Sequence, residues 1–206
     1  MALKELEMIG EQPNNDAVYS IDVPYVAEVT IEGSAAILFH RWSDEDVEAK
    51  GKAAKNSKAK KTDNIETYVY RDEDGNVSIP GESLRMSIVN AGRYRQDPRS
   101  PRKSAMDLLK AGVIVLTEQA STGHRTWDYL DKRRVVIQRS AVTRTRPALL
   151  KGWTATFDVQ VLLPEYIAPD FLLALINDAG RLCGLGDHRP TYGRFAVTSF
   201  SVQKDD

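Results

Sequence analysis

The chain has 206 residues, of which 42% are hydrophobic and 28% are charged, and its formal net charge is −1. These values are typical of a soluble globular protein with a single domain over residues 1–206. The longest apolar runs, such as residues 112–116, are too short to span a bilayer, and the single cysteine excludes an intrachain disulfide and a cysteine zinc cluster. No secretion signal is recognisable, so we expect a cytoplasmic protein without cofactor or metal.

Charge is distributed unevenly along the chain. Residues 1–48 contain eleven acids against Lys4 and Arg41, whereas residues 85–151 contain fifteen Lys or Arg against five acids. Six lysines and no acid lie in residues 50–61. This division favours a basic surface for a polyanion and an acidic surface for another partner, such as a neighbouring copy. The alternative is a solvated lysine loop with scattered surface arginines.

The first part of the chain predicts a strand followed by an insertion. Apolar and polar residues alternate over residues 25–31, and residues 35–39 extend this strand after a kink at Gly33. Residues 48–64 are rich in Lys, Ala, Ser and Asn and contain almost no large apolar residue. We therefore expect them to form a mobile basic insertion within the domain.

The middle of the chain predicts a hairpin, a helix and a basic loop. The sequence DEDGN at residues 72–76 is a turn between short strands, and Pro80-Gly81 ends the second of them. An amphipathic helix follows and ends near Gly92. Residues 96–104 predict a proline-broken basic loop. After it we expect a short helix over residues 104–110 and a buried strand over residues 113–116.

The last part predicts two strands, a helix and a C-terminal strand. Residues 135–138 form a strand entered through three basic residues, and residues 153–163 alternate as a long strand. Residues 171–182 form an amphipathic helix, and residues 195–202 alternate as a final strand.

A basic glycine-rich loop lies between this helix and the final strand. Its glycines allow a close backbone approach or a positive φ, and its other side chains can hold an anion or stack on a base. The residues concerned are Gly184, Gly186, His188, Arg189, Tyr192, Gly193 and Arg194. The alternative is a glycine helix C-cap followed by an ordinary loop.

The two predicted helices share a sequence pattern. LRMSIVNAGR at residues 84–93 and LLALINDAGR at residues 172–181 match at Leu, Ile and Ala-Gly-Arg, with a constant offset of 88. Duplicated strand–helix–strand halves make up a ferredoxin-like βαββαβ fold. The fold class is therefore α+β, with an antiparallel sheet covered by helices on one face.

Two segments resemble the RAMP superfamily, the RRM-like proteins of CRISPR effector complexes. IPGESLR at residues 79–85 is similar to the family's Pro-Gly segment that opens the first helix. Residues 184–195 are similar to its C-terminal glycine-rich loop, although the sequence DHRP replaces glycines in the middle. The resemblance covers the strand–helix frame and omits the lysine tract and residues 95–150. The chain also resembles small proteins of phages and mobile elements.

The resemblance implies binding of single-stranded nucleic acid, with RNA favoured over DNA, by a subunit that assembles as an oligomer or ribonucleoprotein along the strand. Loop arginines supply phosphate contacts, and Tyr94, Trp127, Tyr129 and Tyr192 supply stacking faces. Outside the glycine-rich loop, the binding residues that we predict are Arg85, Arg93, Arg95, Arg133, Arg134, Arg139, Lys58, Lys60 and Lys61. The aromatic signature of an RRM sheet is absent, so loops and backbone should make the contacts, with little sequence preference.

Catalysis is an open alternative. His40 follows a predicted strand, where processing nucleases of this superfamily place a general base, and Arg41 could steady a phosphate. His188 is a second candidate, and Asp187 or Asp44 could serve a metal-assisted cut. No HExxH, GxSxG, Walker A or paired-carboxylate motif is present. Three functions stay open: a non-catalytic binder, a metal-independent endoribonuclease, and a mobile-element protein that joins or inhibits a CRISPR complex through its acidic N-terminal part.

Overall fold

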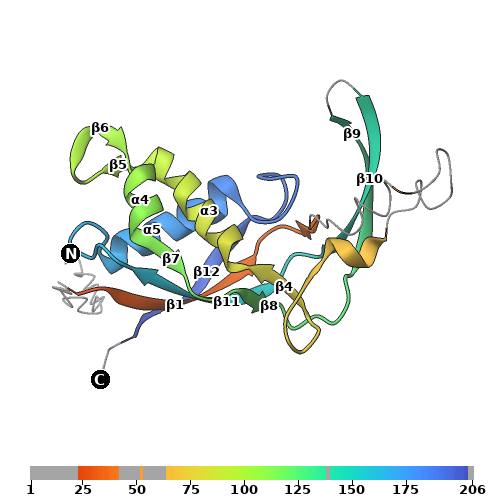
Figure 1. Ribbon diagram of the computed structural model, residues 1–206, viewed down its shortest axis with the longest axis horizontal. Helices are drawn as coiled ribbons and strands as arrows, with labels where there is room; N and C mark the ends of the chain where they lie inside the picture. The colour runs from red at the N-terminus through yellow and green to blue at the C-terminus, as the bar shows by residue number, and fades with distance from the viewer. Residues whose placement is uncertain (1–22, 42–51, 53–63, 138–139, 204–206) are drawn as a thin grey trace, which may run out of the picture.

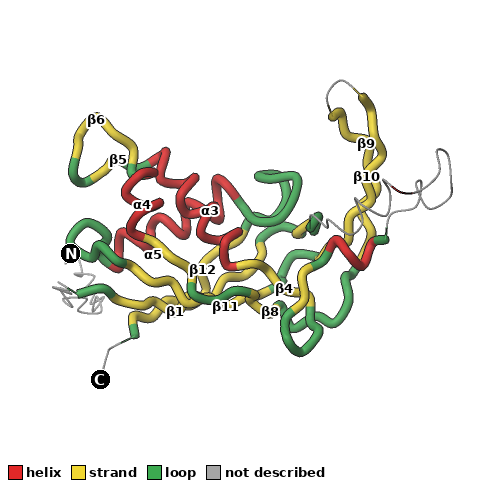
Figure 2. Tube along the Cα trace, in the orientation of Figure 1, coloured by secondary structure: helices red, strands yellow, loops and turns green. Residues whose placement is uncertain are grey.

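A four-stranded antiparallel sheet with helices on one face forms the centre of the protein (Figure 1). The computed structural model describes residues 23–41, 52, 64–137 and 140–203. The strand order is β12–β1–β11–β7, with the strands at β1 (Tyr25–Gly33), β7 (Val113–Val115), β11 (Thr154–Val161) and β12 (Phe195–Val202). The helices are α3 (Gly81–Ala91), α4 (Met106–Gly112) and α5 (Pro169–Asp178). They lie together on the same side of this sheet (Figure 2).

The order of these elements along the chain makes the fold ferredoxin-like. α3 connects β1 to β7, and α5 connects β11 to β12, so the chain runs β–α–β–β–α–β through the central sheet. In the sheet, β11 lies between β1 and β7, and β1 lies between β11 and β12, so the two halves interleave. The fold predicted from the repeated helix pattern is confirmed.

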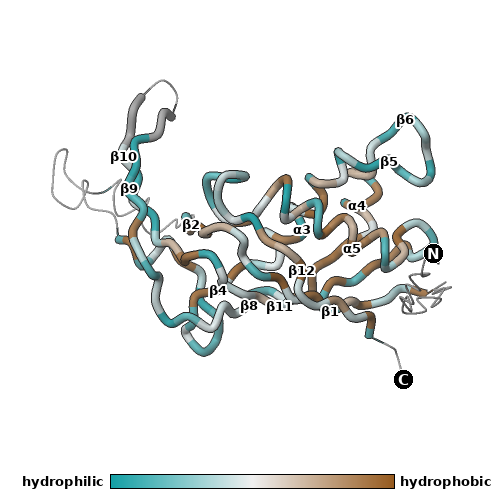
Figure 3. The backbone as a smooth tube through the Cα atoms, turned by 180° about the vertical axis from the view of Figure 1, so that it is seen from behind, coloured by the Kyte–Doolittle hydropathy of each residue, from teal (hydrophilic) through white to brown (hydrophobic). Residues whose placement is uncertain are grey.

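The repeat at an offset of 88 has a packing explanation. Leu84 and Ile88 of α3 correspond to Leu172 and Ile176 of α5, and all four side chains are completely buried. In both halves the helix must present the same apolar spacing to the sheet beneath it. Brown, hydrophobic segments accordingly concentrate where these helices meet the central sheet (Figure 3).

β1 and β11 alternate strictly between a buried and an exposed face. Ala27, Val29 and Ile31 of β1 point into the core, as do Phe157 and Val159 of β11. A period of two therefore fixes which face meets the helices. Among the described residues, every helix is too short or too polar to cross a lipid bilayer.

Three smaller sheets surround this centre. One has the order β2–β10–β9, with β2 at Ile37–Leu38, β9 at Tyr129–Ile137 and β10 at Ser140–Leu149. A second joins β3 (Tyr70–Arg71), β4 (Val77–Pro80) and β8 (Gln119–Ser121), and a third pairs β5 (Gln96–Asp97) with β6 (Ser100–Ser104). The β9–β10 hairpin projects from one end of the molecule, and the β5–β6 hairpin lies at the other end (Figure 1).

Short helical turns complete the chain. One 3-10 turn at Ile65–Tyr68 precedes β3, and another at Gly92–Tyr94 follows α3. A π-helical turn at Ala179–Cys183 extends α5, which accounts for the longer helix predicted over residues 171–182. The lysine-rich insertion predicted at residues 48–64 falls, apart from Lys52 and Asn64, outside the described residues.

Residues 35–39 do not extend β1, as the sequence pattern predicted. The chain leaves the central sheet at Gly33, where the buried Trp153 packs against the backbone and a Cβ would lie 2.1 Å from its indole nitrogen. Trp153 also donates a hydrogen bond of 2.9 Å from Nε1 to the carbonyl of Ala35. The chain then pairs with β10 in register Ile37↔Leu149.

Three further expectations are corrected by the strand pairing. Residues 96–104 form the β5–β6 hairpin, where a loop was expected. β7 pairs only with β11 and lies at the sheet edge, so Ile114 is exposed where a fully buried strand was predicted. β9 begins at Tyr129, several residues earlier than predicted, because it pairs along its length with the unpredicted strand β10.

The glycine-rich loop lies against both the strand–loop segment after β1 and helix α3. The amide of Gly193 donates to the carbonyl of Ala36 at 2.7 Å, and the amide of Asp187 donates to the carbonyl of Leu38 at 2.8 Å. On the other side, the buried Ser87 hydroxyl of α3 donates to the carbonyl of Gly184 at 3.0 Å. The loop therefore joins the segment after β1 to the first helix.

Gly193 should be irreplaceable in this loop. Its φ is +71°, and a Cβ would lie 1.8 Å from the carbonyl oxygen of Leu185. We expect Gly193→Ala to lower the free energy of unfolding by about 3 kcal/mol, from the left-handed conformation and from overpacking together. Gly75 is the matched control, because its φ is +79° and nothing lies within 4 Å of a Cβ there. Urea unfolding should show a loss of only about 1 kcal/mol for Gly75→Ala; equal losses would contradict the steric argument.

Candidate nucleic-acid interface

A cavity of about 400 Å³ lies where β2, β10, the start of α3 and the glycine-rich loop meet. Arg144 and Arg146 of β10 line it together with His40, which follows β2. Asp187 of the glycine-rich loop and Ser83 of α3 also line it. The volume is within the range of small-molecule sites, and charged groups converge on an otherwise apolar wall.

His40 is held as a neutral ring. Its Nε2 lies 2.6 Å from Nη1 of Arg144, and a guanidinium can only donate, so Nε2 is the acceptor. Burial lowers the pKa of His40, and the positive charge of Arg144 lowers it further. The ring also stacks on Tyr68 with centroids 4.6 Å apart. His40 is thus oriented by two neighbours and uncharged at neutral pH.

Arg146 is a buried cation with an incomplete set of partners. Its side chain is 7% exposed, and its Nε donates to Oδ2 of Asp187 at 2.5 Å. Among the described residues, its Nη1 is buried and has no hydrogen-bond partner. A buried donor left unsatisfied costs about 1–3 kcal/mol, so this nitrogen is a candidate contact for a ligand oxygen.

Asp187 stays ionised beside Arg146. Burial would raise its pKa, but the hydrogen bonds from Arg146 and from the amide of His188 outweigh burial and hold the pKa below its usual range. The His188 amide donates to Oδ1 of Asp187 at 2.8 Å, with His188 itself at a φ of +58°. The turn of the glycine-rich loop is therefore what aims this carboxylate at Arg146.

A second cluster joins the glycine-rich loop to the β9–β10 hairpin. Arg133 of β9 forms an ion pair with Asp131 and donates a hydrogen bond to the hydroxyl of Tyr192. The guanidinium carbon also lies 4.7 Å from the centroid of the Tyr192 ring. These partners raise the pKa of Arg133. Tyr192 and Arg133, both predicted from sequence, are brought together.

Arg93 and Arg189 are also brought together. They line a shallower hollow of about 310 Å³ with Tyr94, Cys183 and Pro190. Burial raises the pKa of the Cys183 thiol, which is thereby kept protonated. Arg93, Tyr94 and Arg189 are exposed, so cationic and aromatic groups are accessible here as well.

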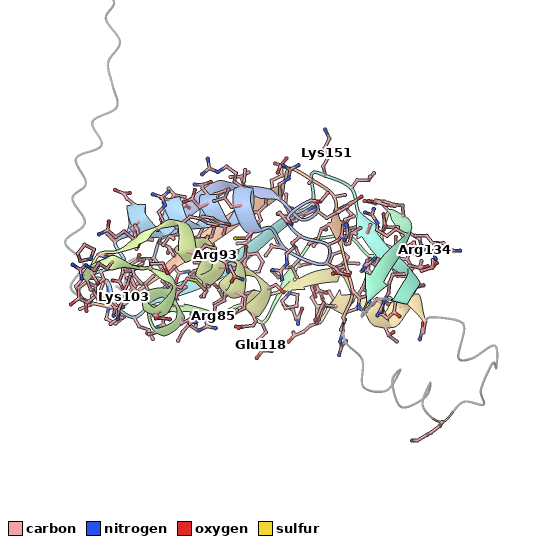
Figure 4. All side chains as sticks on the ribbon, turned by 90° about the horizontal axis from the view of Figure 1, so that it is seen from above. Arg85, Arg93, Lys103, Glu118, Arg134 and Lys151 are labelled. Carbon is pink, nitrogen blue, oxygen red and sulfur yellow. The ribbon has the colours of Figure 1, made fainter. Side chains whose placement is uncertain are left out.

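The remaining predicted residues fall into three groups. Arg134, His188 and Arg194 are exposed, and Arg134 lies on β9 at the end of the molecule opposite Lys103 (Figure 4). Arg85 instead donates from Nε to the carbonyl of Val113 and from Nη2 to that of Lys110, and Arg95 pairs with Asp178. Outside the described residues lie Lys58, Lys60, Lys61, Arg139, Asp44 and the acidic residues 1–22.

Sequence reasoning missed the cavity. Arg144 and Arg146 counted only among the basic residues of 85–151, and Ser83 was not singled out. Their alternation in TRTRP was an available signal, because residues i and i+2 of a strand share a face. That they meet Asp187 follows from the pairing of β10 with β2, which no local pattern encodes.

The uncovered face of the central sheet is acidic. Glu28 and Glu32 of β1 and Asp158 of β11 lie on it, and the other outward residues of these two strands are Val, Thr and Gln. The three carboxylates would repel phosphate groups. The expectation that loops, and not an aromatic sheet face, carry any nucleic-acid contacts stays a prediction. Among the described residues no group of three or more His, Cys, Asp or Glu is placed to hold a metal ion.

Comparisons with known proteins connect the fold to one solved assembly. No protein-family model and no curated protein matches the chain. A chain in the cryo-EM structure of the Type III-B Cmr-beta bound to cognate target RNA matches with a TM-score of 0.54 and 13% identity. The likeness is one of fold. It covers 88% of this chain and 61% of the neighbour, so this protein spans less than two thirds of that chain's length.

The Arg146–Asp187 pair should stabilise the protein above acidic pH. We expect Asp187→Asn to lower the free energy of unfolding by about 1–2 kcal/mol, less than for a fully buried pair because Asp187 is partly exposed. The folded-state pKa lies below the unfolded value of about 3.9, so the contribution of the carboxylate is present above that value and lost as pH falls through the folded pKa. The variant should therefore lose less stability on acidification than the wild type does.

The control for this prediction is Asp107→Asn, since Asp107 pairs with Lys110 on an exposed helix surface. Its urea midpoint should move little at any pH. A midpoint of Asp187→Asn that equals the wild type at pH 7 would contradict the assigned role of the pair.

Proposed function

We propose that the protein is a non-catalytic, single-stranded RNA-binding subunit of a CRISPR-type ribonucleoprotein. The observation that carries the proposal is the basic β9–β10 hairpin, which stands beside the glycine-rich loop on a ferredoxin-like frame. Residues 129–149 contain six Lys or Arg and one acid. The solved neighbour with this fold belongs to a Cmr complex bound to target RNA. The RAMP resemblance of residues 79–85 and 184–195 supports the same assignment.

The positions of the charges support backbone recognition. Lys132 and Arg134 are exposed on the projecting hairpin, and His188, Arg189 and Arg194 are exposed on the glycine-rich loop. Cationic side chains on two adjacent elements can follow a phosphodiester chain without reading base edges. The carboxylates on the uncovered face of the central sheet would repel the phosphates of the strand from that face. We further propose that residues 1–206 form one domain and that several copies assemble along the strand.

Endoribonuclease activity is the second candidate, because the neutral His40 lines a cavity with two arginines. A general base needs a free acceptor nitrogen. Nε2 of His40 already accepts from Arg144, which leaves Nδ1 carrying the proton. The observed hydrogen bond therefore favours a positioning role for His40.

Exchange of one hairpin cation should change the salt dependence of binding. Each phosphate neutralised on a single strand contributes about −0.7 to the slope of log K against log salt. We expect Arg134→Gln to flatten the slope for an oligouridylate by about that amount, equally for other sequences. Lys103→Gln removes the same charge at the opposite end and serves as the control (Figure 4). Fluorescence anisotropy across a salt series measures the slope for both variants. If Arg134→Gln and Lys103→Gln change the slope equally, the strand does not lie on the hairpin.

His40 separates a binder from a nuclease. We expect wild-type protein to leave RNA intact and His40→Ala to leave it intact as well. Were His40 a general base, wild-type protein would cleave RNA and the variant would be slower by roughly 100-fold or more. A substrate with hydrogen in place of the 2′-hydroxyl would then also resist cleavage. Gel analysis in the presence of EDTA measures cleavage of both substrates by the wild type and the variant. Metal-independent cleavage that is lost in His40→Ala would overturn the non-catalytic assignment.

A further inference from the structure

The cavity beside β10 has a property that backbone binding on the hairpin does not explain. Arg146 lines it, yet its side chain is more than nine-tenths buried, out of reach of a strand lying on the surface. Its Nη1 is a buried donor without a partner among the described residues. Because the side chain of Arg146 lines the cavity, a ligand that pairs with this guanidinium would have to enter there. The acceptor that suits a guanidinium best is a carboxylate or a phosphate.

The remaining charges in the cavity also favour an anion. Arg144 and Arg146 line it against the single carboxylate of Asp187, and the adjacent His40 is neutral. A cation entering this site would meet an excess of positive charge. Asp187 satisfies only Nε of Arg146, so the pair leaves one edge of the guanidinium for another acceptor.

The N-terminus of α3 adds a second, independent source of positive potential. This helix is eleven residues long, and Ser83 in its first turn lines the cavity. No side chain among the described residues caps its N-terminus, because the N-cap residue is Pro80. The amide of Gly81 already donates to the carbonyl of Glu118 at 3.0 Å, so the helix dipole and the next amides of the first turn are what attract a negatively charged group. The buried arginine of β10 and the start of α3 thus line the same cavity.

The other walls are apolar and suit a planar ring. Ile37, Phe39, Ile79 and Pro80 line the cavity, and Tyr70 adds an aromatic face. Inorganic phosphate would leave these walls uncovered, whereas a nucleotide carries both a phosphate and a flat ring.

We propose that this cavity is a nucleotide subsite, in which Arg146, Arg144 and the N-terminus of α3 hold one phosphate and the apolar wall around Tyr70 holds the base. This proposal rests on the proposed function, because the nucleotide that occupies the cavity would be one residue of the bound RNA strand. A free nucleoside monophosphate presents the same chemistry. The apolar walls lack a fixed set of donors and acceptors, so the subsite accepts different bases.

Isothermal titration calorimetry on the full chain tests the assignment with three probes. We expect uridine 5′-monophosphate to bind at least ~10-fold more tightly than uridine, which lacks the phosphate, and than inorganic phosphate, which lacks the ring. Equal affinity for the monophosphate and uridine would overturn the phosphate role. Equal affinity for the monophosphate and inorganic phosphate would reduce the cavity to an anion site and overturn the nucleotide assignment.

Two substitutions localise the binding. Arg146→Lys retains the charge beside Asp187 but removes Nη1, and Arg144→Gln removes the second cation from a partly exposed position. Each should weaken monophosphate binding by roughly 10-fold. Lys103→Gln is the control, because it removes an exposed charge at the other end of the molecule (Figure 4). If Arg146→Lys fails to fold, by circular dichroism, Arg144→Gln decides. Loss of binding in Lys103→Gln, or none in Arg144→Gln, would overturn the location.

The oligouridylate assay separates this proposal from the function itself. If the wild-type protein binds the oligouridylate with the expected salt dependence but the monophosphate gives no heat of binding, the cavity subsite is overturned and the RNA-binding function stands. If the monophosphate binds but the oligouridylate does not, the RNA-binding function is overturned and the cavity subsite stands. When both are present, competition by the monophosphate for the strand indicates that a nucleotide of the strand occupies the cavity. Without competition, the source is a free nucleotide.

Discussion

The backbone of residues 34–38 holds the accessory elements of this protein to its central sheet. On one side it accepts hydrogen bonds from Gly193 and Asp187 of the glycine-rich loop, and on the other it pairs as β2 with β10. One short extended segment thus connects a loop near the C-terminus with a hairpin from the middle of the chain. The arrangement depends on Gly33, where the chain turns out of the sheet under Trp153. Without that turn, residues 34–38 would continue β1 and the two basic elements would have no common support.

Electrostatics divides the molecule along the same line. The uncovered sheet face carries the carboxylates Glu28, Glu32 and Asp158, whereas the elements attached through β2 carry exposed cations such as Lys132, Arg134 and Arg189. The exceptional charge is Arg146, which is buried and only partly paired. Burial of a guanidinium is costly unless its donors are satisfied, so the hydrogen bond to Asp187 stabilises the fold while the remaining donor stays available. The subsite proposed above would therefore use a side chain that also stabilises the fold.

The ferredoxin-like frame alone does not specify a function, because many unrelated activities share it. What distinguishes this chain is the set of elements added to the frame. The β9–β10 hairpin offers exposed cations, the glycine-rich loop offers Tyr192 stacked against Arg133, and the space between them forms the cavity with His40. These features come from three separate sheets, and each is positioned by backbone pairing. Rigid placement of this kind suits recognition of a repeating backbone more than an exposed flexible loop would.

The sequence by itself determined the elements whose signal is local. Alternation predicted β1, β11 and β12, and the apolar spacing repeated at an offset of 88 predicted both covering helices and the ferredoxin-like class, because burying one face imposes a period of 2 or 3.6. Only the tertiary structure decided that residues 35–39 leave the sheet, that β10 exists, and that Arg144 and Arg146 meet Asp187. Two of these depend on contacts between distant residues, because Ile37 pairs with Leu149 and Arg146 forms its ion pair with Asp187. β10 pairs with its neighbour β9 through backbone hydrogen bonds, which carry no side-chain signature.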